Sequence, residues 1–117
     1  MQDFRKLLVW QKSRVLVADI YKITATFPTD ERFGLTSQMR RASVGIGAAI
    51  AEGCGRGSRK DVLRFFQIGF GSTTELLHHF ITALDLGFLS QEDFDRLDQK
   101  LLEIRKMPAS LMKKLRV

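Results

Sequence analysis

Residues 35–53 read LTSQMRRASVGIGAAIAEG, and this segment combines an apolar stripe with many small residues. The stripe advances by alternating steps of four and three residues, which is the spacing of one face of an α-helix. It consists of Leu35, Met39, Ala42, Ile46, Ala49 and Gly53. Each glycine inside a helix lowers helix propensity by about 1 kcal/mol relative to alanine. We therefore expect a neighbouring helix to approach this segment closely enough to compensate.

Three further segments have a helical period, and short breaks separate all four. The stripe of the first segment is Val9, Ser13, Leu16, Ile20, Ile23 and Phe27. That of the third segment is Val62, Phe66, Gly69, Thr73, Leu76, Phe80 and Leu84. That of the fourth segment is Phe94, Leu97, Leu101, Ile104, Pro108, Leu111 and Leu115. The first segment ends at Pro28, because the residue before a proline avoids helical angles, and residues 29–31 then offer a helix start. Ser58 and Ser90 are the predicted N-caps of the third and fourth segments, and Gly87 suits the C-terminal end of the third.

The shortness of the breaks decides the predicted topology. Such connections force consecutive helices to run in opposite directions. The sequence thus predicts an all-α fold with a single domain over residues 1–117, an antiparallel up-down-up-down four-helix bundle. Pro108 lies inside the fourth segment and is expected to kink or interrupt it near Arg105. Further apolar residues beside the main stripes favour self-association, with a wide core face as the alternative.

The charge of the chain favours a polyanionic partner. There are 19 Lys and Arg residues against 13 Asp and Glu residues, so the formal net charge is +6. In the predicted topology the N-terminus, the second break and the C-terminus meet at one basic end, whereas acidic residues gather at the other end. The candidate nucleic-acid contacts at the basic end are Arg56, Arg59, Lys60 and Arg64, supported by Lys113, Lys114 and Arg116. The alternative is a solvated basic surface with no partner.

The sequence lacks the residues that a disulfide, a di-iron or multi-cysteine zinc site, or a P-loop requires. Cys54 is the single cysteine, which rules out an intrachain disulfide and a multi-cysteine zinc site. Glu75 and His78 form one Glu-x-x-His motif, whereas a di-iron bundle carries two. The glycine-rich segments lack the Gly-Lys-Ser/Thr of a P-loop. We therefore expect no enzyme activity, metal or cofactor.

The expected location of the protein is the cytoplasm. The apolar run near the N-terminus is too short for a signal peptide. No apolar stretch approaches the roughly 20 residues that span a bilayer, so a membrane partner is not expected.

One polar set has a structural interpretation. If the second break is the turn between two helices, Glu75 lies near Gln38 and within a turn of Arg41. The sequence then predicts an interhelical Arg41–Glu75 ion pair, with Gln38 beside it, that fixes the register of the helices. The alternative is that Arg40 or Arg41 faces outward as a phosphate contact.

Five groups of short motifs, in order along the chain, carry a resemblance to a known family. They are Phe4 with LVWQK at 8–12; FP at 27–28 with Glu31 and FGL at 33–35; SQMRRA at 37–42; IAEG at 50–53 followed by Gly55 and Arg56; and GS at 71–72 with Glu75. Together they resemble the bacterial four-helix-bundle family named for proteins encoded in intervening sequences of 23S ribosomal RNA genes. The resemblance runs from about Phe4 to Leu115.

This resemblance implies a ring-like homo-oligomer, a homopentamer, with no enzyme activity. Relatives include the accessory protein of diversity-generating retroelements, which binds nucleic acid and a reverse transcriptase. The family-typical positions in this chain are Gln38, Arg41, Glu52, Arg56 and Glu75. The leading hypothesis is therefore a non-enzymatic oligomer that binds structured RNA through its basic end. The alternative is an interaction scaffold that recruits a protein partner such as a reverse transcriptase.

Overall fold

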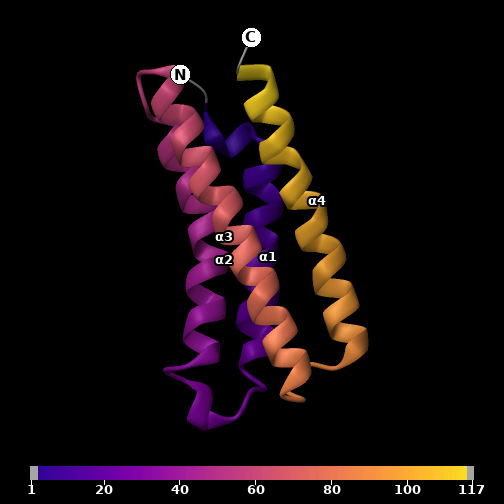
Figure 1. Cartoon of the computed structure of the whole chain (residues 1–117). Coiled ribbons are helices and arrows are strands. Elements are labelled where there is room, and N and C mark those ends of the chain that lie inside the picture. Colours follow the sequence, from indigo (N-terminus) through magenta and orange to yellow (C-terminus); the bar gives the residue numbers. More distant parts are fainter. Residues whose placement is uncertain (1–2, 116–117) are drawn as a thin grey trace.

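The chain forms four α-helices that lie side by side (Figure 1). The structure, a computed structural model, describes the backbone of residues 3–115 and the side chains of residues 3–106. The helices are α1 (Leu8–Thr24), α2 (Leu35–Cys54), α3 (Arg59–Asp85) and α4 (Gln91–Leu115), with two short 3-10 helices, η1 (Phe4–Lys6) and η2 (Thr29–Glu31). No strand occurs in residues 3–115, so the predicted all-α fold with four helices is confirmed.

Contacts between neighbouring helices pair the start of one with the end of the next. Arg40, early in α2, donates from Nε to Oγ1 of Thr24 at the end of α1, at 2.9 Å. Gly47, later in α2, faces Ser13 nearer the start of α1. Figure 1 shows the same alternation through all four helices, with both chain ends at one end of a molecule that measures 45 × 24 × 20 Å.

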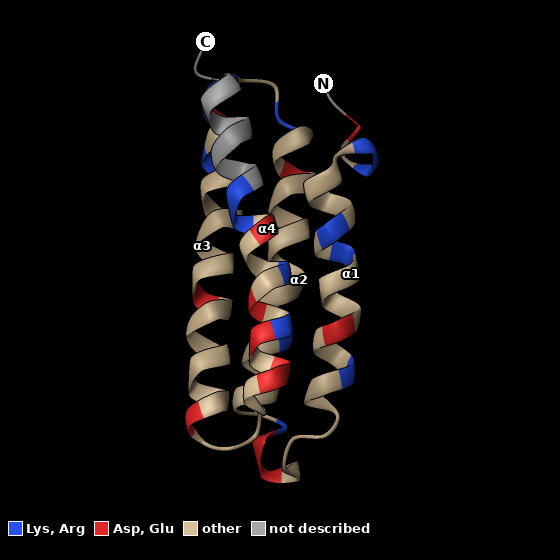
Figure 2. Ribbon diagram, turned by 90° about the vertical axis from the view of Figure 1, so that its right-hand side faces the viewer, with Lys and Arg blue, Asp and Glu red and all other residues tan. Residues whose placement is uncertain are grey.

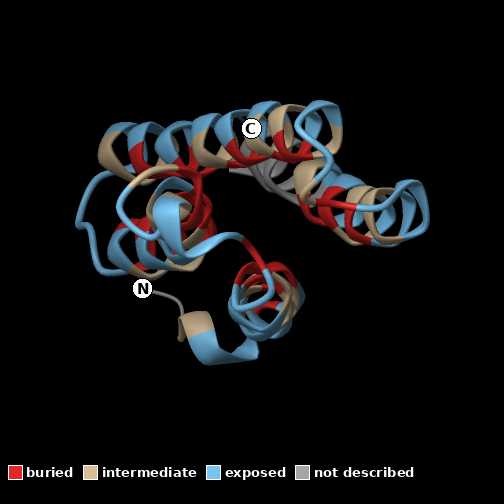
Figure 3. Ribbon diagram, turned by 90° about the horizontal axis from the view of Figure 1, so that it is seen from below, coloured by how far each residue is buried: buried red, intermediate tan, exposed pale blue. Residues whose placement is uncertain are grey.

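The predicted apolar stripes form the core. All six stripe residues of α2 are buried, as are the central stripe positions of α1, α3 and α4. The buried positions lie on the sides of the helices that face one another (Figure 3). The predicted stripe members Ile23, Val62, Leu84 and Phe94 are only partly buried. Ser13 is buried as predicted, and its hydroxyl donates to the carbonyl of Trp10 at 2.7 Å.

The glycines of α2 permit close packing on two sides. A Cβ at Gly53 would lie 3.0 Å from Cβ of Phe65 and 3.1 Å from the ring of Phe66, both on α3. A Cβ at Gly47 would lie 2.9 Å from the hydroxyl of Ser13 on α1. The expected close approach of neighbouring helices is therefore present, and side chains of α1 and α3 occupy the space that the missing Cβ atoms leave.

The ends of α3 and α4 follow the predicted capping. The hydroxyls of Ser58 and Ser90 accept from the backbone N–H of Asp61 and Asp93, at 3.2 and 3.1 Å. Gly87 follows α3 with φ of +77°, a conformation that L side chains rarely adopt. Helix α4 is continuous to Leu115, so Pro108 does not interrupt it.

The start of α2 differs from the prediction. Residues 29–31 form the 3-10 helix η2, and α2 begins only at Leu35. Glu31 still acts as a cap, because its Oε1 accepts from the backbone N–H of Leu35 at 3.2 Å. One of the expected helix-start residues, Glu31, therefore caps the helix from outside it.

Among the helix pairs that touch, the contact between α1 and the described part of α4 is the least extensive, whereas α2 and α3 pack most extensively. Two ion pairs bridge α1 and α4: Lys12 to Glu103 at 2.9 Å and Lys100 to Asp19 at 2.6 Å. The hydrogen bond and charge of Lys12 lower the pKa of Glu103. Among the described helices, none has the length and hydropathy to cross a bilayer.

Candidate nucleic-acid interface

Four predicted contact residues lie close together where α2 turns into α3. We call Arg56, Arg59, Lys60 and Arg64 the basic corner. Helix α2 ends at Cys54 with Gly55 as its C-cap, and Ser58 begins α3, so Arg59 and Lys60 fall in the first turn of α3. All four members of the corner are exposed.

An aromatic ring holds two of these guanidinium groups. The Cζ atoms of Arg56 and Arg64 lie 4.4 and 4.9 Å from the ring centroid of Phe65, which is itself buried. Arg56 also forms an ion pair with Glu52 at 3.5 Å. A cation over an aromatic face is attracted by the ring quadrupole. The Phe65 ring therefore attracts the guanidinium groups of Arg56, before the turn, and of Arg64, after it, and brings them close together. This role of Phe65 was not predicted from the sequence.

The first turns of α3 also shape an open depression. Its volume is about 650 Å³, and its lining includes Arg59, Lys60, Asp61 and Arg64. Asp61 is the acidic member of this lining, and its backbone N–H is committed to the Ser58 cap. The lining therefore carries three cations against one carboxylate.

Basic and acidic residues separate towards opposite ends of the described molecule. Figure 2 shows acidic positions concentrated around η2 and the α3–α4 turn, and basic positions at the end that holds η1 and the α2–α3 turn. Arg5 at the basic end pairs with Asp3, Nε to Oδ1 and NH2 to Oδ2, both at 3.0 Å. These hydrogen bonds lower the pKa of Asp3. The supporting residues Lys113, Lys114 and Arg116 lie outside the described side chains.

The predicted Arg41–Glu75 ion pair is not formed. Glu75 instead contacts His79 one turn along α3, with Nε2 and Oε2 3.1 Å apart. Arg41 is exposed and has no hydrogen bond or ion pair within the described part of the chain, and Gln38 is exposed as well. The two helices are offset by about four residues, one turn, from the predicted alignment, since a Cβ at Gly45 would meet Ser72 Oγ at 3.2 Å. This offset brings Glu75 level with Arg41, so the pair is absent because both side chains are exposed and Glu75 contacts its own helix.

Other candidate chemistry finds no support in the described residues. Cys54 is buried in the core, and that burial, followed by the negative charge of Asp3, raises the pKa of its thiol. A raised pKa and burial keep the thiol protonated and inaccessible. Within the described part of the chain, no three His, Cys, Asp or Glu side chains group as a metal site would require.

A second group of arginines lies on α2 and the η2–α2 turn. The sequence offered Arg40 or Arg41 as an outward-facing phosphate contact, but it did not predict the pocket that the group shares. Arg32, Arg40 and Arg41 share a pocket with Tyr21 of α1 and with Phe33. The sequence held a partial signal, because Ser37 and Arg41 are four residues apart and share one face of α2. Phe33 precedes that helix, so only the structure places it in the same pocket.

Comparison with known proteins agrees with this architecture. A protein with unknown function from the S23 ribosomal protein family of Bacteroides thetaiotaomicron has a crystal structure with a TM-score of 0.82 to this chain. The two are 23% identical, and the match covers 91% of this chain and 99% of that one. A search of curated proteins found no match. The family model of the 23S rRNA-intervening sequence protein matches residues 5–110. The chain therefore belongs to the 23S rRNA-intervening sequence protein family.

Proposed function

We propose that this chain is a non-enzymatic cytoplasmic protein, an antiparallel up-down-up-down bundle, that binds structured RNA through the basic corner. The observation that carries the proposal is the convergence of four cations at one turn, two of them held against Phe65. Guanidinium groups suit this role, because their fixed fork of donors matches the oxygens of a phosphate.

The arrangement favours recognition of a backbone over recognition of bases. Arg59, Lys60 and Arg64 surround an open depression rather than a narrow slot. Double-stranded RNA is recognised mostly through its shape and its phosphates. We infer that the basic corner contacts phosphates of a folded RNA and contributes little sequence preference.

Reversing two charges of the basic corner is expected to weaken RNA binding. In the variant Arg59→Glu/Lys60→Glu, affinity for a hairpin RNA should fall roughly 10- to 100-fold at about 50 mM salt. The slope of log affinity against log salt should become shallower by about 2, since each lost phosphate contact removes roughly 0.9. Fluorescence anisotropy with a labelled hairpin RNA, a single-stranded RNA and a duplex DNA measures both quantities.

The matched control is Arg14→Glu/Lys22→Glu, which changes the net charge equally at two exposed positions of α1. Equal losses in both double variants would show that net charge, and not the corner, attracts RNA. Weak binding that is the same for all three nucleic acids would overturn the RNA proposal and favour a scaffold for a protein partner.

We also propose that the bundle assembles into a ring-like homo-oligomer, a pentamer by its family resemblance. Ile68 and Ile81 support self-association, because these α3 side chains are 49% and 45% exposed. A ring repeats the basic corner and strengthens weak single contacts by avidity. Light scattering after size exclusion should give a particle of five 13.4 kDa chains. A mass of one chain at all concentrations would contradict the ring.

A further inference from the structure

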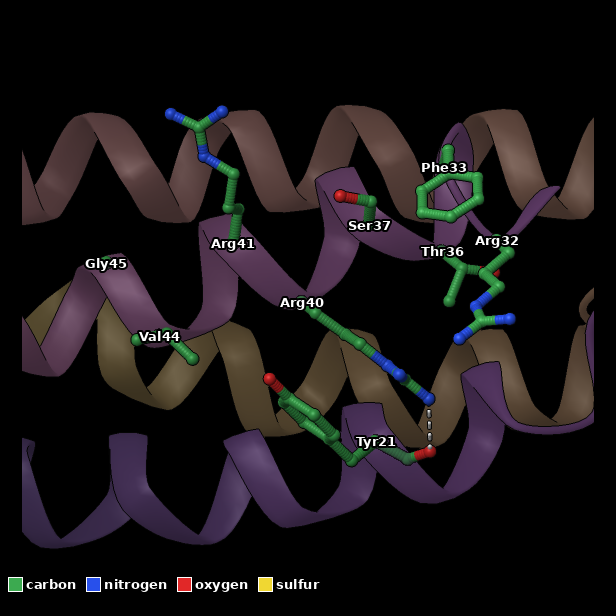
Figure 4. A pocket seen from close by; sticks show the side chains of 9 residues that line it. All are labelled: Tyr21, Arg32, Phe33, Thr36, Ser37, Arg40, Arg41, Val44 and Gly45. Carbon is green, nitrogen blue, oxygen red and sulfur yellow. Dashed lines mark hydrogen bonds between the residues drawn. The ribbon is translucent and has the colours of Figure 1, made fainter.

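The second arginine group lies in a pocket over α2, with α1 on one side (Figure 4). We call it the α1–α2 pocket, and its volume is about 510 Å³. Its lining includes Tyr21, Arg32, Phe33, Ser37, Arg40 and Arg41. This volume lies within the range of pockets that hold small ligands.

The pocket is strongly cationic. Three arginines contribute to its lining, and no carboxylate does so among the described residues. The acidic neighbour in the sequence, Glu31, directs Oε1 to the backbone N–H of Leu35 at 3.2 Å. That carboxylate occupies the N-terminus of α2, so an anion in the pocket would be bound by arginine side chains and not by the helix end.

The arginines have different roles. Arg40 is anchored, because Nε donates to Oγ1 of Thr24 at 2.9 Å and its NH2 approaches the carbonyl of Tyr21 at 3.4 Å. Arg41 has no such partner among the described residues, and Figure 4 shows its guanidinium extending away from Arg40. Arg40 therefore supplies a fixed charge, whereas the donors of Arg41 are free for a ligand.

Exposed aromatic rings accompany these charges. Phe33 is 88% exposed, which leaves the ring without a packing role in the described chain. The Arg32 guanidinium lies 5.5 Å from the Phe33 centroid, and that of Arg40 lies 4.5 Å from the Tyr21 centroid. Rings beside arginines are the combination on which nucleic-acid bases stack, because every base has a flat π-face.

We propose that the α1–α2 pocket binds a nucleoside phosphate, with the base stacked on Phe33 and the phosphate held by Arg41. The ligand is a free nucleotide or one unit of a single-stranded RNA, since both carry this chemistry. The proposal does not rest on the basic corner, which lies at the opposite end of α2. It explains both the exposed Phe33 just before α2 and, on that helix, an Arg41 that has no partner among the described residues.

The test uses labelled oligouridine and the full chain carrying Arg59→Glu/Lys60→Glu, so that binding at the basic corner is removed. Phe33→Leu in this background should weaken oligouridine binding roughly 5- to 100-fold, the loss typical of one stacked base. Arg41→Gln should reduce the salt slope by about 1, and Arg41→Lys should preserve it. Leu86→Ala removes another exposed apolar side chain and should change nothing.

Competition experiments separate the sources of the ligand. If ATP displaces oligouridine at a similar nucleotide concentration, the ligand of the pocket is a free nucleotide. If oligouridine stays bound in excess ATP, the ligand is an RNA strand. Displacement by inorganic phosphate as efficient as by ATP overturns the proposal, because no base is then recognised. Equal displacement by oligoglutamate, or binding that is unchanged by Phe33→Leu, overturns it as well. If the basic corner binds no RNA, Arg59→Glu/Lys60→Glu leaves oligouridine binding unchanged, whereas Phe33→Leu still weakens oligouridine binding.

Discussion

Replacing Phe80 with alanine should lower the free energy of unfolding by about 4 kcal/mol. The Phe80 side chain has no exposed surface and is among the largest side chains buried in the core. Removing a buried phenylalanine ring loses its transfer free energy and leaves a cavity, a combination that costs about 3–5 kcal/mol. Domains of this size have a total stability of about 5–15 kcal/mol, so the loss is roughly a quarter to four fifths of the total. Urea denaturation followed by circular dichroism measures the change.

Ile81 provides the control, because it is adjacent in sequence but 45% exposed. Ile81→Ala should change the free energy of unfolding of the dissociated chain by less than about 1 kcal/mol. A loss for Phe80→Ala no larger than that for Ile81→Ala would show that the α3 stripe does not face the core.

Replacing Gly53 with leucine should destabilise the bundle by about 3 kcal/mol. The added Cβ alone would lie 3.0 Å from Cβ of Phe65, a distance that requires a shift of helix α3, and the rest of the side chain would need further space. Overpacking a filled core costs typically about 1–3 kcal/mol and sometimes more. This cost exceeds the roughly 1 kcal/mol that helix propensity regains when glycine is removed. Because Phe65 also holds Arg56 and Arg64, the same shift should weaken RNA binding.

Gly71→Leu is the matched control on α3. No atom lies within 4 Å of a Cβ built at Gly71, so the added side chain meets open space within the described chain. The gain in helix propensity should then stabilise the dissociated chain by up to about 1 kcal/mol. Similar destabilisation by both substitutions would contradict the close packing of α2 on α3. Thermal unfolding of the two variants provides the comparison.

Local and periodic features of the fold could be predicted from the sequence. The stripe of α2 became a buried face because steps of four and three residues are a property of the helix itself. The Ser58 cap was equally local, since the hydroxyl and the N–H that it accepts are three residues apart. The helix start at residues 29–31 was wrong because η2 intervenes before Gly34, and a capping carboxylate can reach the helix from outside it.

Features that depend on register could not be predicted in the same way. The basic corner follows directly from the sequence, because its members lie within nine residues around one turn. The Arg41–Glu75 pair depended on the alignment of α2 with α3 and also on the directions of the two side chains, which are both exposed, with Glu75 in contact with His79 on its own helix. The α1–α2 pocket requires Tyr21 to meet Arg40 across a helix interface, a contact that only the packing of α1 on α2 determines.

The unequal packing of the helices has a consequence for motion. Proteins open in cooperative units, and units with few buried contacts open at the lowest free energy. The two ion pairs between α1 and α4 are partly exposed, so they add little resistance to separation of these helices. Helices α2 and α3 instead pack closely, with side chains of one helix against glycines of the other, and the basic corner lies where α2 turns into α3. Slow amide hydrogen exchange should therefore concentrate in α2 and α3, and the RNA-binding groups should keep their positions while the α1–α4 side of the bundle opens transiently.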